Sequence, residues 1–386
     1  MAFLEFSGVG VTAMAGAVPH TIINNYEYTD YFPADQVKEV VDKIGVYERR
    51  FADNSTCSSD LCFAAAERLI NDNSINREEI DLLIFISQTP DYRMPATSII
   101  LQDRLRLSKS CIAFDINLGC SAFLYGLSVA YSMMQGGNLR KALILDGETR
   151  SKVYSPKDRR SAFIFGDGGV AALVERSEKF GRSVFSLNSD GSRSDLIMIK
   201  GGGYRHPSSM ETLREKVVDE YGNIRSDEQG YMNGGDVFTF VIREIPRDIK
   251  KTLEYCGMTA SDMDYIVFHQ ANNFINSYIA KKMKLDFLKM PSTIAKYGNT
   301  SSVSVPLTIV SELKGKLDGS NTLLLSAFGV GMTWATGIVP FVDCKISDIV
   351  EVSEGKEITL FNRGGVKTYL SASYNADKGL ITLTAA

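Results

Sequence analysis

The amino-acid sequence predicts an α/β protein made of two similar halves. Strand-like apolar runs alternate with helical segments, which favours a mainly parallel sheet. Two strand-like runs of the first half, residues 81–86 (DLLIFI) and 142–145 (ALIL), recur in the second half as residues 264–269 (DYIVFH) and 322–325 (TLLL). Because the two runs are separated by similar lengths of chain in each half, we interpret them as a duplicated α/β unit.

The composition is typical of a soluble globular protein and excludes several functional classes. The chain has 386 residues, of which 44% are hydrophobic and 23% charged, and its net charge is −4. This charge gives no reason to expect nucleic-acid binding, and no apolar run is long enough to span a membrane. The six cysteines show neither zinc-site spacing nor a disulfide pattern. We therefore expect no metal site, no signal peptide and a cytoplasmic location.

Cys120 is the first candidate functional residue. It follows a strand-like run at 111–116 and precedes an apolar stretch at 122–134 that predicts a buried helix. Unpaired N–H groups and the positive end of the helix dipole stabilise a thiolate at such a position. Cys120 is thus a candidate nucleophile, although a lone cysteine at a helix start is more often an inert buried thiol.

The chain contains three histidines, and His269 differs from the other two. His20 and His206 stand next to prolines in polar loops, where we expect surface positions. His269 ends an apolar strand, and an imidazole at the end of a core strand needs a hydrogen-bond partner or a function. A core histidine with satisfied hydrogen bonds is the alternative interpretation.

The loop at 298–302 (GNTSS) occupies the place in the second half that the Cys120 loop occupies in the first. Each loop precedes an apolar helix, here at 303–313. Under a pseudo-twofold relation, Cys120 and Asn299 would face one shared site. The duplication therefore predicts that Cys120, His269 and Asn299 lie together.

Four motifs make the chain resemble the beta-ketoacyl-ACP synthase III family of the thiolase superfamily. They are GCSAF at 119–123, HQAN at 269–272, GNTS at 298–301 and AFGVG at 327–331, and they come in the family's order. Supporting matches lie at 45–50, 156–159 and 164–168. The resemblance implies a thiolase-like, duplicated five-layer αβαβα fold.

The resemblance also implies a chemistry for these residues. Cys120 would accept an acyl group from a thioester, and a malonyl thioester would lose CO2 to give the attacking carbanion. His269 and Asn299 would donate hydrogen bonds to the thioester oxygen of the malonyl group as it gains negative charge. The backbone N–H groups of Cys120 and Val330 would form an oxyanion hole, although the family usually has glycine at the Val330 position. No cofactor is expected beyond the coenzyme A or ACP phosphopantetheine thioesters themselves.

Further substrate contacts and a homodimer follow from the same resemblance. Met94 corresponds to a family residue that crosses the dimer contact and lines the acyl pocket of the partner. The residues expected to bind substrate are Lys43, Arg159, Asn272, Phe274, Phe238 and Met94.

The substrate entrance departs from the family pattern at three positions. Glu39 replaces a tryptophan that stacks on adenine, Phe274 replaces an arginine, and Gly235 replaces an asparagine. A carboxylate cannot stack on adenine and repels phosphates. Three explanations are open: an acyl-ACP donor instead of acyl-CoA, a shifted binding mode, and drift at a tolerant surface.

Three parts of the chain are expected. The N-terminal half covers residues 1–175 and the C-terminal half covers 176–340, with a polar insertion at 198–235. In this insertion we predict a charged helix over 211–220 and a lid over the site. Residues 341–386 predict a small β extension, with strands at 357–361, 366–371 and 379–384 around turns at 362–365 and 375–379.

These observations favour a decarboxylative Claisen condensation of an acyl thioester with malonyl-ACP or a related malonyl thioester. The expected partners are acyl-CoA or acyl-ACP and the acyl carrier protein, in fatty-acid initiation or in a specialised acyl or polyketide-type pathway. One alternative is transfer of the acyl group from Cys120 to a hydroxyl or amine. A second alternative is a non-catalytic subunit of a condensing heterodimer.

Overall fold

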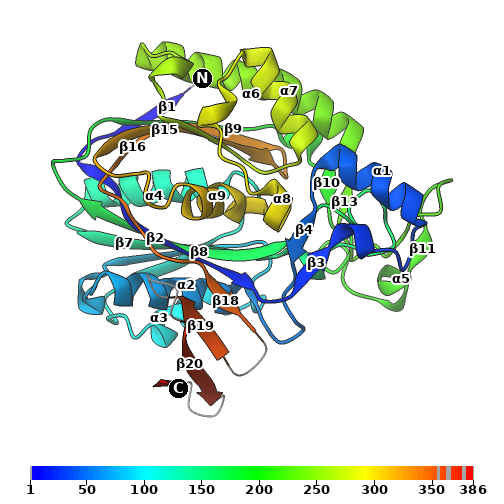
Figure 1. Cartoon of the computed structure of the whole chain (residues 1–386), viewed down its shortest axis with the longest axis horizontal. Coiled ribbons are helices and arrows are strands. Elements are labelled where there is room, and N and C mark those ends of the chain that lie inside the picture. The colour runs from blue at the N-terminus through cyan, green and yellow to red at the C-terminus, as the bar shows by residue number, and fades with distance from the viewer. Residues whose placement is uncertain (1, 354–356, 362–366, 376–379, 386) are drawn as a thin grey trace.

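The computed structural model has five layers, and it describes residues 2–353, 357–361, 367–375 and 380–385. Two sheets enclose the helices α4 (Ala122–Gly136) and α9 (Ser304–Glu312) at the centre of the molecule (Figure 1). Further helices cover the outer face of each sheet. The predicted thiolase-like α/β fold is confirmed by this arrangement.

The first sheet has five strands and carries α6 (Gly234–Cys256) and α7 (Asn273–Met283) on its outer face (Figure 1). In order across the sheet, its strands are β1 (Phe3–Phe6), β9 (Ser183–Ser189), β16 (Thr333–Val342), β15 (Ser320–Gly329) and β14 (Tyr265–Phe268).

The second sheet has ten strands and is covered outside by α2 (Ser58–Asp72) and α3 (Thr97–Arg104) (Figure 1). Its main strands, in order, are β18 (Val350–Val352), β2 (Val9–Pro19), β8 (Asp167–Arg176), β7 (Lys141–Thr149), β5 (Leu82–Ile86) and β6 (Ile112–Ile116), and β17 (Lys345–Ile346) pairs separately with β2.

The duplication predicted from the sequence corresponds to equivalent strand pairs. In the first half β5 runs parallel to β7, with Leu82 opposite Ala142. In the second half β14 runs parallel to β15, with Tyr265 opposite Leu323. These are the four strands whose sequences recur, and their apolar side chains are buried because helices cover both faces of each sheet.

The core between the sheets explains why the central helices are apolar on most sides. Leu124 and Leu127 of α4 pack in one cluster with Leu307 of α9 and with Ile84 and Leu323 from the two sheets. A helix buried between two sheets contacts apolar side chains on most sides, so its own residues are mostly apolar. No helix in the described part of the chain is long and apolar enough to cross a membrane.

The C-terminal strands extend the second sheet. β18 pairs in parallel with β2, and β19 (Glu357–Phe361), β20 (Lys367–Asn375) and β21 (Leu380–Ala385) follow as antiparallel neighbours. The predicted β extension is therefore present. Apart from Asn375, the turns predicted at 362–365 and 375–379 lie outside the described residues.

The prediction of a charged helix over 211–220 is wrong. Helix α5 spans only Met210–Leu213, and β11 (Lys216–Val217) then pairs antiparallel with β12 (Ile224–Arg225). The Asp219 carboxylate accepts the backbone N–H groups of Tyr221 and Asn223, which closes the turn between these strands. A short polar side chain that caps a turn outweighs the weak helical preference of the charged run.

Several short strands and helices lie beside the two large sheets. The short strands β10 (Ile197–Met198) and β13 (Tyr231–Met232) form an antiparallel pair at the two ends of the insertion. The remaining strands and α-helices are β3 (Ile22–Asn24), β4 (Glu48–Arg50), α1 (Ala34–Ile44) and α8 (Ile294–Tyr297).

Candidate active site

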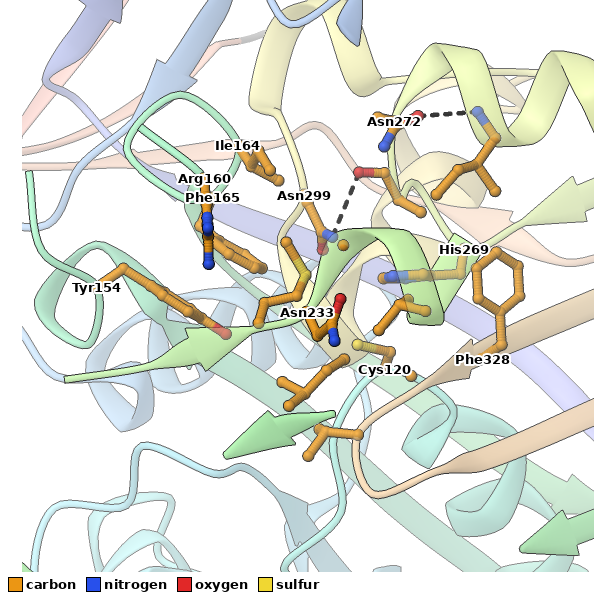
Figure 2. Close-up of a pocket in the computed structure, with 18 of the residues that line it drawn as sticks. Cys120, Tyr154, Arg160, Ile164, Phe165, Asn233, His269, Asn272, Asn299 and Phe328 are labelled. Carbon is orange, nitrogen blue, oxygen red and sulfur yellow. Dashed lines mark hydrogen bonds between the residues drawn. The ribbon is translucent and has the colours of Figure 1, made fainter. Parts of the chain in front are cut away.

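Cys120 lies at the amino end of α4, as predicted, and lines a cavity of about 590 Å³ (Figure 2). The residue is 7% exposed. The end of β15 approaches so closely that a Cβ on Gly329 would stand 2.4 Å from the Cys120 Sγ. Glycine is required at this position because any side chain would displace the thiol.

The Cys120 thiol has a raised pKa, with burial as the largest cause. The Arg150 guanidinium and hydrogen bonds from Ser301 and the Val330 backbone oppose this shift. The prediction of a thiolate stabilised at the helix end is therefore corrected: the resting group is a thiol, because the enclosing loops remove it from water.

His269 follows β14 directly and faces the same cavity, with 2% of its surface exposed. Its Nδ1 lies 2.6 Å from the Ser304 Oγ, which also accepts the Gln270 N–H at 3.2 Å. We assign the Ser304 hydroxyl as the donor to Nδ1, which leaves the ring proton on Nε2. His20 and His206 are exposed, as expected.

Burial lowers the pKa of His269 to about 3, and a hydrogen bond with the Ser301 backbone offsets this only partly. The imidazole is therefore neutral at physiological pH. A neutral ring with a proton on Nε2 is a hydrogen-bond donor to a substrate oxygen and not a cationic acid.

Asn299 lines the cavity, and its amide nitrogen is directed toward the Ala271 carbonyl oxygen (Figure 2). Its Oδ1 accepts the Ser301 N–H at 2.9 Å, so the orientation of the amide is fixed. Its Nδ2 lies 3.5 Å from the Ala271 carbonyl oxygen, which is a weak contact. The N–H groups of Asn299 thus keep capacity for a ligand.

Val330 lies beside Cys120, and both line the cavity. The Val330 backbone forms a hydrogen bond with the Cys120 thiol. Its side chain packs over Gly119, where a Cβ would stand 2.3 Å from the Val330 Cγ1. The valine is accommodated by a neighbouring glycine, and its backbone remains at the thiol as an oxyanion hole requires.

The residues predicted to bind substrate do not all meet in the cavity. Asn272 lines it and also caps α7, accepting the Ile275 N–H at 2.8 Å. Gly235 lines it as well. Among the described residues, the other predicted contacts do not line this cavity; they are Lys43, Arg159, Phe238, Phe274 and Met94.

These outer residues are exposed or half-buried. Phe274 is 49% exposed and stacks on Phe238 with ring centroids 5.3 Å apart. Lys43 is exposed at the end of α1, and Arg159 donates to Gln36.

Sequence reasoning missed several cavity residues. Arg150 lines the cavity. Tyr154, Phe165, Asn233 and Arg160 line it as well (Figure 2). The insertion contributes residues 231–235, while its middle does not line the cavity. A sequence signal existed for Arg150, since it directly follows a buried apolar strand, but strand ends are also common surface positions.

Comparison with known proteins identifies chains of similar sequence and structure. The family model described as 3-oxoacyl-[acyl-carrier-protein] synthase III matches residues 114–191. The model for the C-terminal part of the same family matches residues 253–341. The chain is 33% identical over 337 residues to a beta-ketoacyl-[acyl-carrier-protein] synthase III of Caldanaerobacter subterraneus, covering 87% of this chain and 98% of the relative.

Solved structures agree with this similarity. A 3-oxoacyl-(acyl-carrier protein) synthase from Burkholderia xenovorans superposes with a TM-score of 0.85 at 35% identity, covering 91% of this chain and 99% of the other. A beta-ketoacyl-[acyl carrier protein] synthase III from Thermus thermophilus gives a TM-score of 0.74 at 30% identity, with 86% and 98% covered.

Proposed function

The chain belongs to the beta-ketoacyl-ACP synthase III family, and from this we propose that it condenses an acyl thioester with malonyl-ACP and releases CO2. The observation that carries the proposal is that Cys120, His269 and Asn299, which come from three separate loops, line one cavity. Each supplies a group that this reaction needs: a nucleophile and two neutral hydrogen-bond donors.

The first step loads the acyl group onto Cys120. The Cys120 Sγ forms a bond to the acyl carbon, the carbon–sulfur bond of the donor thioester breaks, and the thiol proton leaves with the donor sulfur. The backbone N–H groups of Cys120 and Val330 stabilise the oxygen of the tetrahedral intermediate. Arg150 opposes the effect of burial on the Cys120 pKa, which favours the thiolate as it forms.

The second step forms the new carbon–carbon bond. The malonyl carboxylate leaves as CO2, and its electron pair remains on the thioester as an enolate. The His269 Nε2–H and the Asn299 amide donate to the enolate oxygen. The enolate carbon then attacks the acyl carbonyl, the bond to Cys120 breaks, and the released thiolate takes up a proton from water.

The test measures both steps separately. The enzyme is incubated with a panel of acyl-CoA and acyl-ACP donors, and the mass of acylated Cys120 is determined. Labelled malonyl-ACP is then added and CO2 release is measured. We expect an acyl adduct on Cys120 followed by CO2 and a β-ketoacyl-ACP.

Two other outcomes would identify the alternative functions. An acyl-Cys120 that forms without any later CO2 release would exclude condensation and favour transfer to a hydroxyl or amine. A Cys120 that reacts with neither the donors nor iodoacetamide would indicate a non-catalytic subunit. The same donor panel decides between coenzyme A and ACP as first carrier, which the exposed Glu39 leaves open.

We further propose a homodimer in which Met94 reaches the acyl pocket of the partner. Met94 is 81% exposed in the single chain, as a residue that inserts into another subunit would be. A Met94→Phe variant should accept shorter acyl chains than the wild type, because the larger side chain fills the pocket. Chain-length preference is measured with a homologous series of donors, and an unchanged preference would contradict the placement of Met94.

The matched control is Met210→Phe, the same exchange at a methionine that is 87% exposed in the insertion. It should leave the chain-length preference as it is. Six free thiols suit a reducing compartment, and we place the enzyme in the cytoplasm, with no cofactor beyond its acyl carriers.

A further inference from the structure

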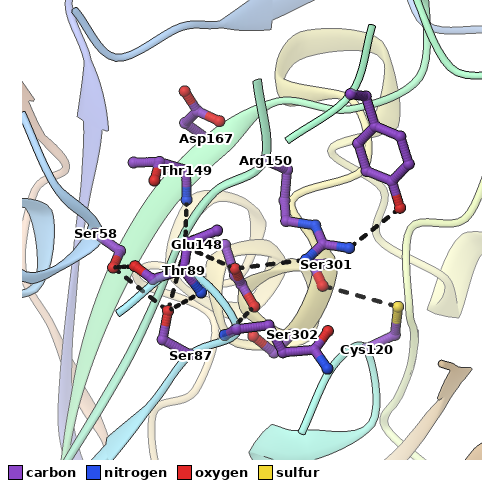
Figure 3. Close-up of polar contacts among 12 residues, drawn as sticks. Ser58, Ser87, Thr89, Cys120, Glu148, Thr149, Arg150, Asp167, Ser301 and Ser302 are labelled. Carbon is purple, nitrogen blue, oxygen red and sulfur yellow. Dashed lines mark hydrogen bonds and ion pairs between the residues drawn. The ribbon is translucent and has the colours of Figure 1, made fainter. Parts of the chain in front are cut away.

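Arg150 is a buried cation in the wall of the active-site cavity, and Figure 3 shows it between Glu148 and Tyr154 and near Cys120. It follows β7 directly, and only 5% of its surface is exposed. It lines the same cavity as Cys120, and its charge acts on the Cys120 thiol. A guanidinium is rarely placed in such an environment without a partner of opposite charge.

The hydrogen-bonding capacity of Arg150 is largely unused. A guanidinium has five N–H donors. The Arg150 Nη2 donates to the Tyr154 hydroxyl at 3.2 Å, whereas the buried Nε has no hydrogen-bond partner in the described structure. The guanidinium also lies near the faces of Tyr154 and Phe165, at 5.4 and 5.8 Å from the ring centroids. Buried donors without acceptors are costly, so an acceptor is expected from the substrate.

Glu148 does not supply this acceptor. The Arg150 Nη1 and the Glu148 Oε2 are 3.9 Å apart, which is beyond hydrogen-bond distance. The Glu148 oxygens instead accept the Gln88 N–H at 3.0 Å and the Thr89 hydroxyl at 2.9 Å (Figure 3). Glu148 balances part of the charge of Arg150 but leaves its donors available.

The acyl group on Cys120 has to occupy this cavity, whose other walls near Arg150 include the aromatic rings of Tyr154 and Phe165. An unbranched alkyl chain would cover the guanidinium with hydrocarbon and give its N–H groups nothing to bind. A carboxylate would accept two parallel hydrogen bonds from it. Methylene groups between the carboxylate and the thioester would lie against the rings.

We propose that the acyl group carried by Cys120 ends in a carboxylate, which Arg150 binds. The substrate class is then a short dicarboxylic acid joined at one end to the carrier thiol, such as a succinyl or glutaryl thioester. This inference rests on the proposed condensing function and specifies its first substrate. Arg150 acts as the residue that determines acyl specificity.

The experiment compares two donors of similar length on the wild-type enzyme, glutaryl and pentanoyl thioesters on the carrier that the donor panel selects. The rate at which Cys120 gains the acyl mass is measured for each. We expect glutaryl to react at least about tenfold faster, the effect of one hydrogen-bonded charge. Glutarate should also protect Cys120 from iodoacetamide more strongly than pentanoate does. This second measurement uses the wild-type enzyme alone.

Two substitutions locate the preference. Arg150→Leu should reverse the ratio in favour of pentanoyl, because the carboxylate loses its partner. Arg160→Leu is the matched control: this second arginine of the cavity is exposed and already paired with Asp219 at 2.9 Å. It should keep the preference for glutaryl.

Faster acylation by pentanoyl in the wild type would overturn the carboxylate proposal while leaving the condensing function intact. The same conclusion would follow if Arg150→Leu slowed both donors equally, since Arg150 would then act on the thiol alone. If neither these donors nor the wider panel acylated Cys120, the condensing function itself would fail, and this inference with it.

Discussion

A Cys120→Ala variant is expected to form no acyl-enzyme with any thioester donor and to lose condensation completely. The reason is that the acyl carbon must bond to the Cys120 sulfur before the enolate can attack it. Intact mass after incubation with the donors measures the first effect, and formation of β-ketoacyl-ACP measures the second. Decarboxylation of malonyl-ACP should remain detectable in this variant, because His269 and Asn299 are still in place.

The control is Cys256→Ala, which removes a half-buried thiol outside the cavity-lining residues and should acylate like the wild type. This comparison separates the particular chemistry of Cys120 from general thiol reactivity. An acyl adduct of equal size on the Cys120→Ala variant would show that another residue carries the acyl group, and the proposed function would have to be abandoned.

The sequence predicted the three central residues because their positions depend on a repeated pattern. His269 ends an apolar strand, whereas Cys120 and Asn299 each lie in a loop that precedes an apolar helix, and the duplication relates these two loops. Parallel strands under buried helices bring such ends to one place. The order of apolar and polar residues predicts where these residues lie, whereas their chemical roles follow from the four family motifs.

The state of the Cys120 thiol could not be predicted in the same way. Its environment depends on residues brought from the other half of the chain, including Ser301 and the Val330 backbone. The helix end alone favours a thiolate, whereas the burial produced by these loops favours the thiol. Arg150 likewise follows a strand, as many surface residues do, whereas in the folded protein Tyr154 and Phe165 pack against its guanidinium.

The error at 211–220 has a local cause. Charged residues there occur at a density typical of an exposed helix, but Asp219 binds two backbone N–H groups and closes a turn. The sequence Tyr221-Gly222-Asn223 carried the competing signal, and Gly222 adopts the positive φ of 77° that such turns require. Turn chemistry over three residues decided the fold of the segment.

Replacing His269 with alanine is expected to slow decarboxylation of malonyl-ACP by about 10²–10³ while Cys120 still accepts acyl groups. The Asn299→Ala variant should show the same division. In the proposed mechanism both residues donate to the oxygen that becomes negative when CO2 leaves, whereas backbone N–H groups hold the acyl carbonyl. The measurement compares CO2 release with the mass gain of Cys120. His20→Ala, at an exposed histidine, is the control and should change neither step.

The pH dependence of CO2 release distinguishes a neutral donor from a cationic acid. Burial lowers the pKa of His269 from 6.5 to about 3, so its ring stays uncharged from pH 5 to pH 8. We therefore expect the wild type and the His269→Ala variant to show the same pH dependence of the decarboxylation rate near pH 6.5. A titration seen only in the wild type would mean that the imidazole is protonated in the working enzyme, and its role would then be that of a general acid. The absence of this titration, together with the retained acylation of Cys120, would establish His269 as a neutral donor. Because burial keeps the imidazole uncharged, its Nε2–H can bind the enolate oxygen, whereas a cationic imidazole could protonate the enolate and stop the condensation.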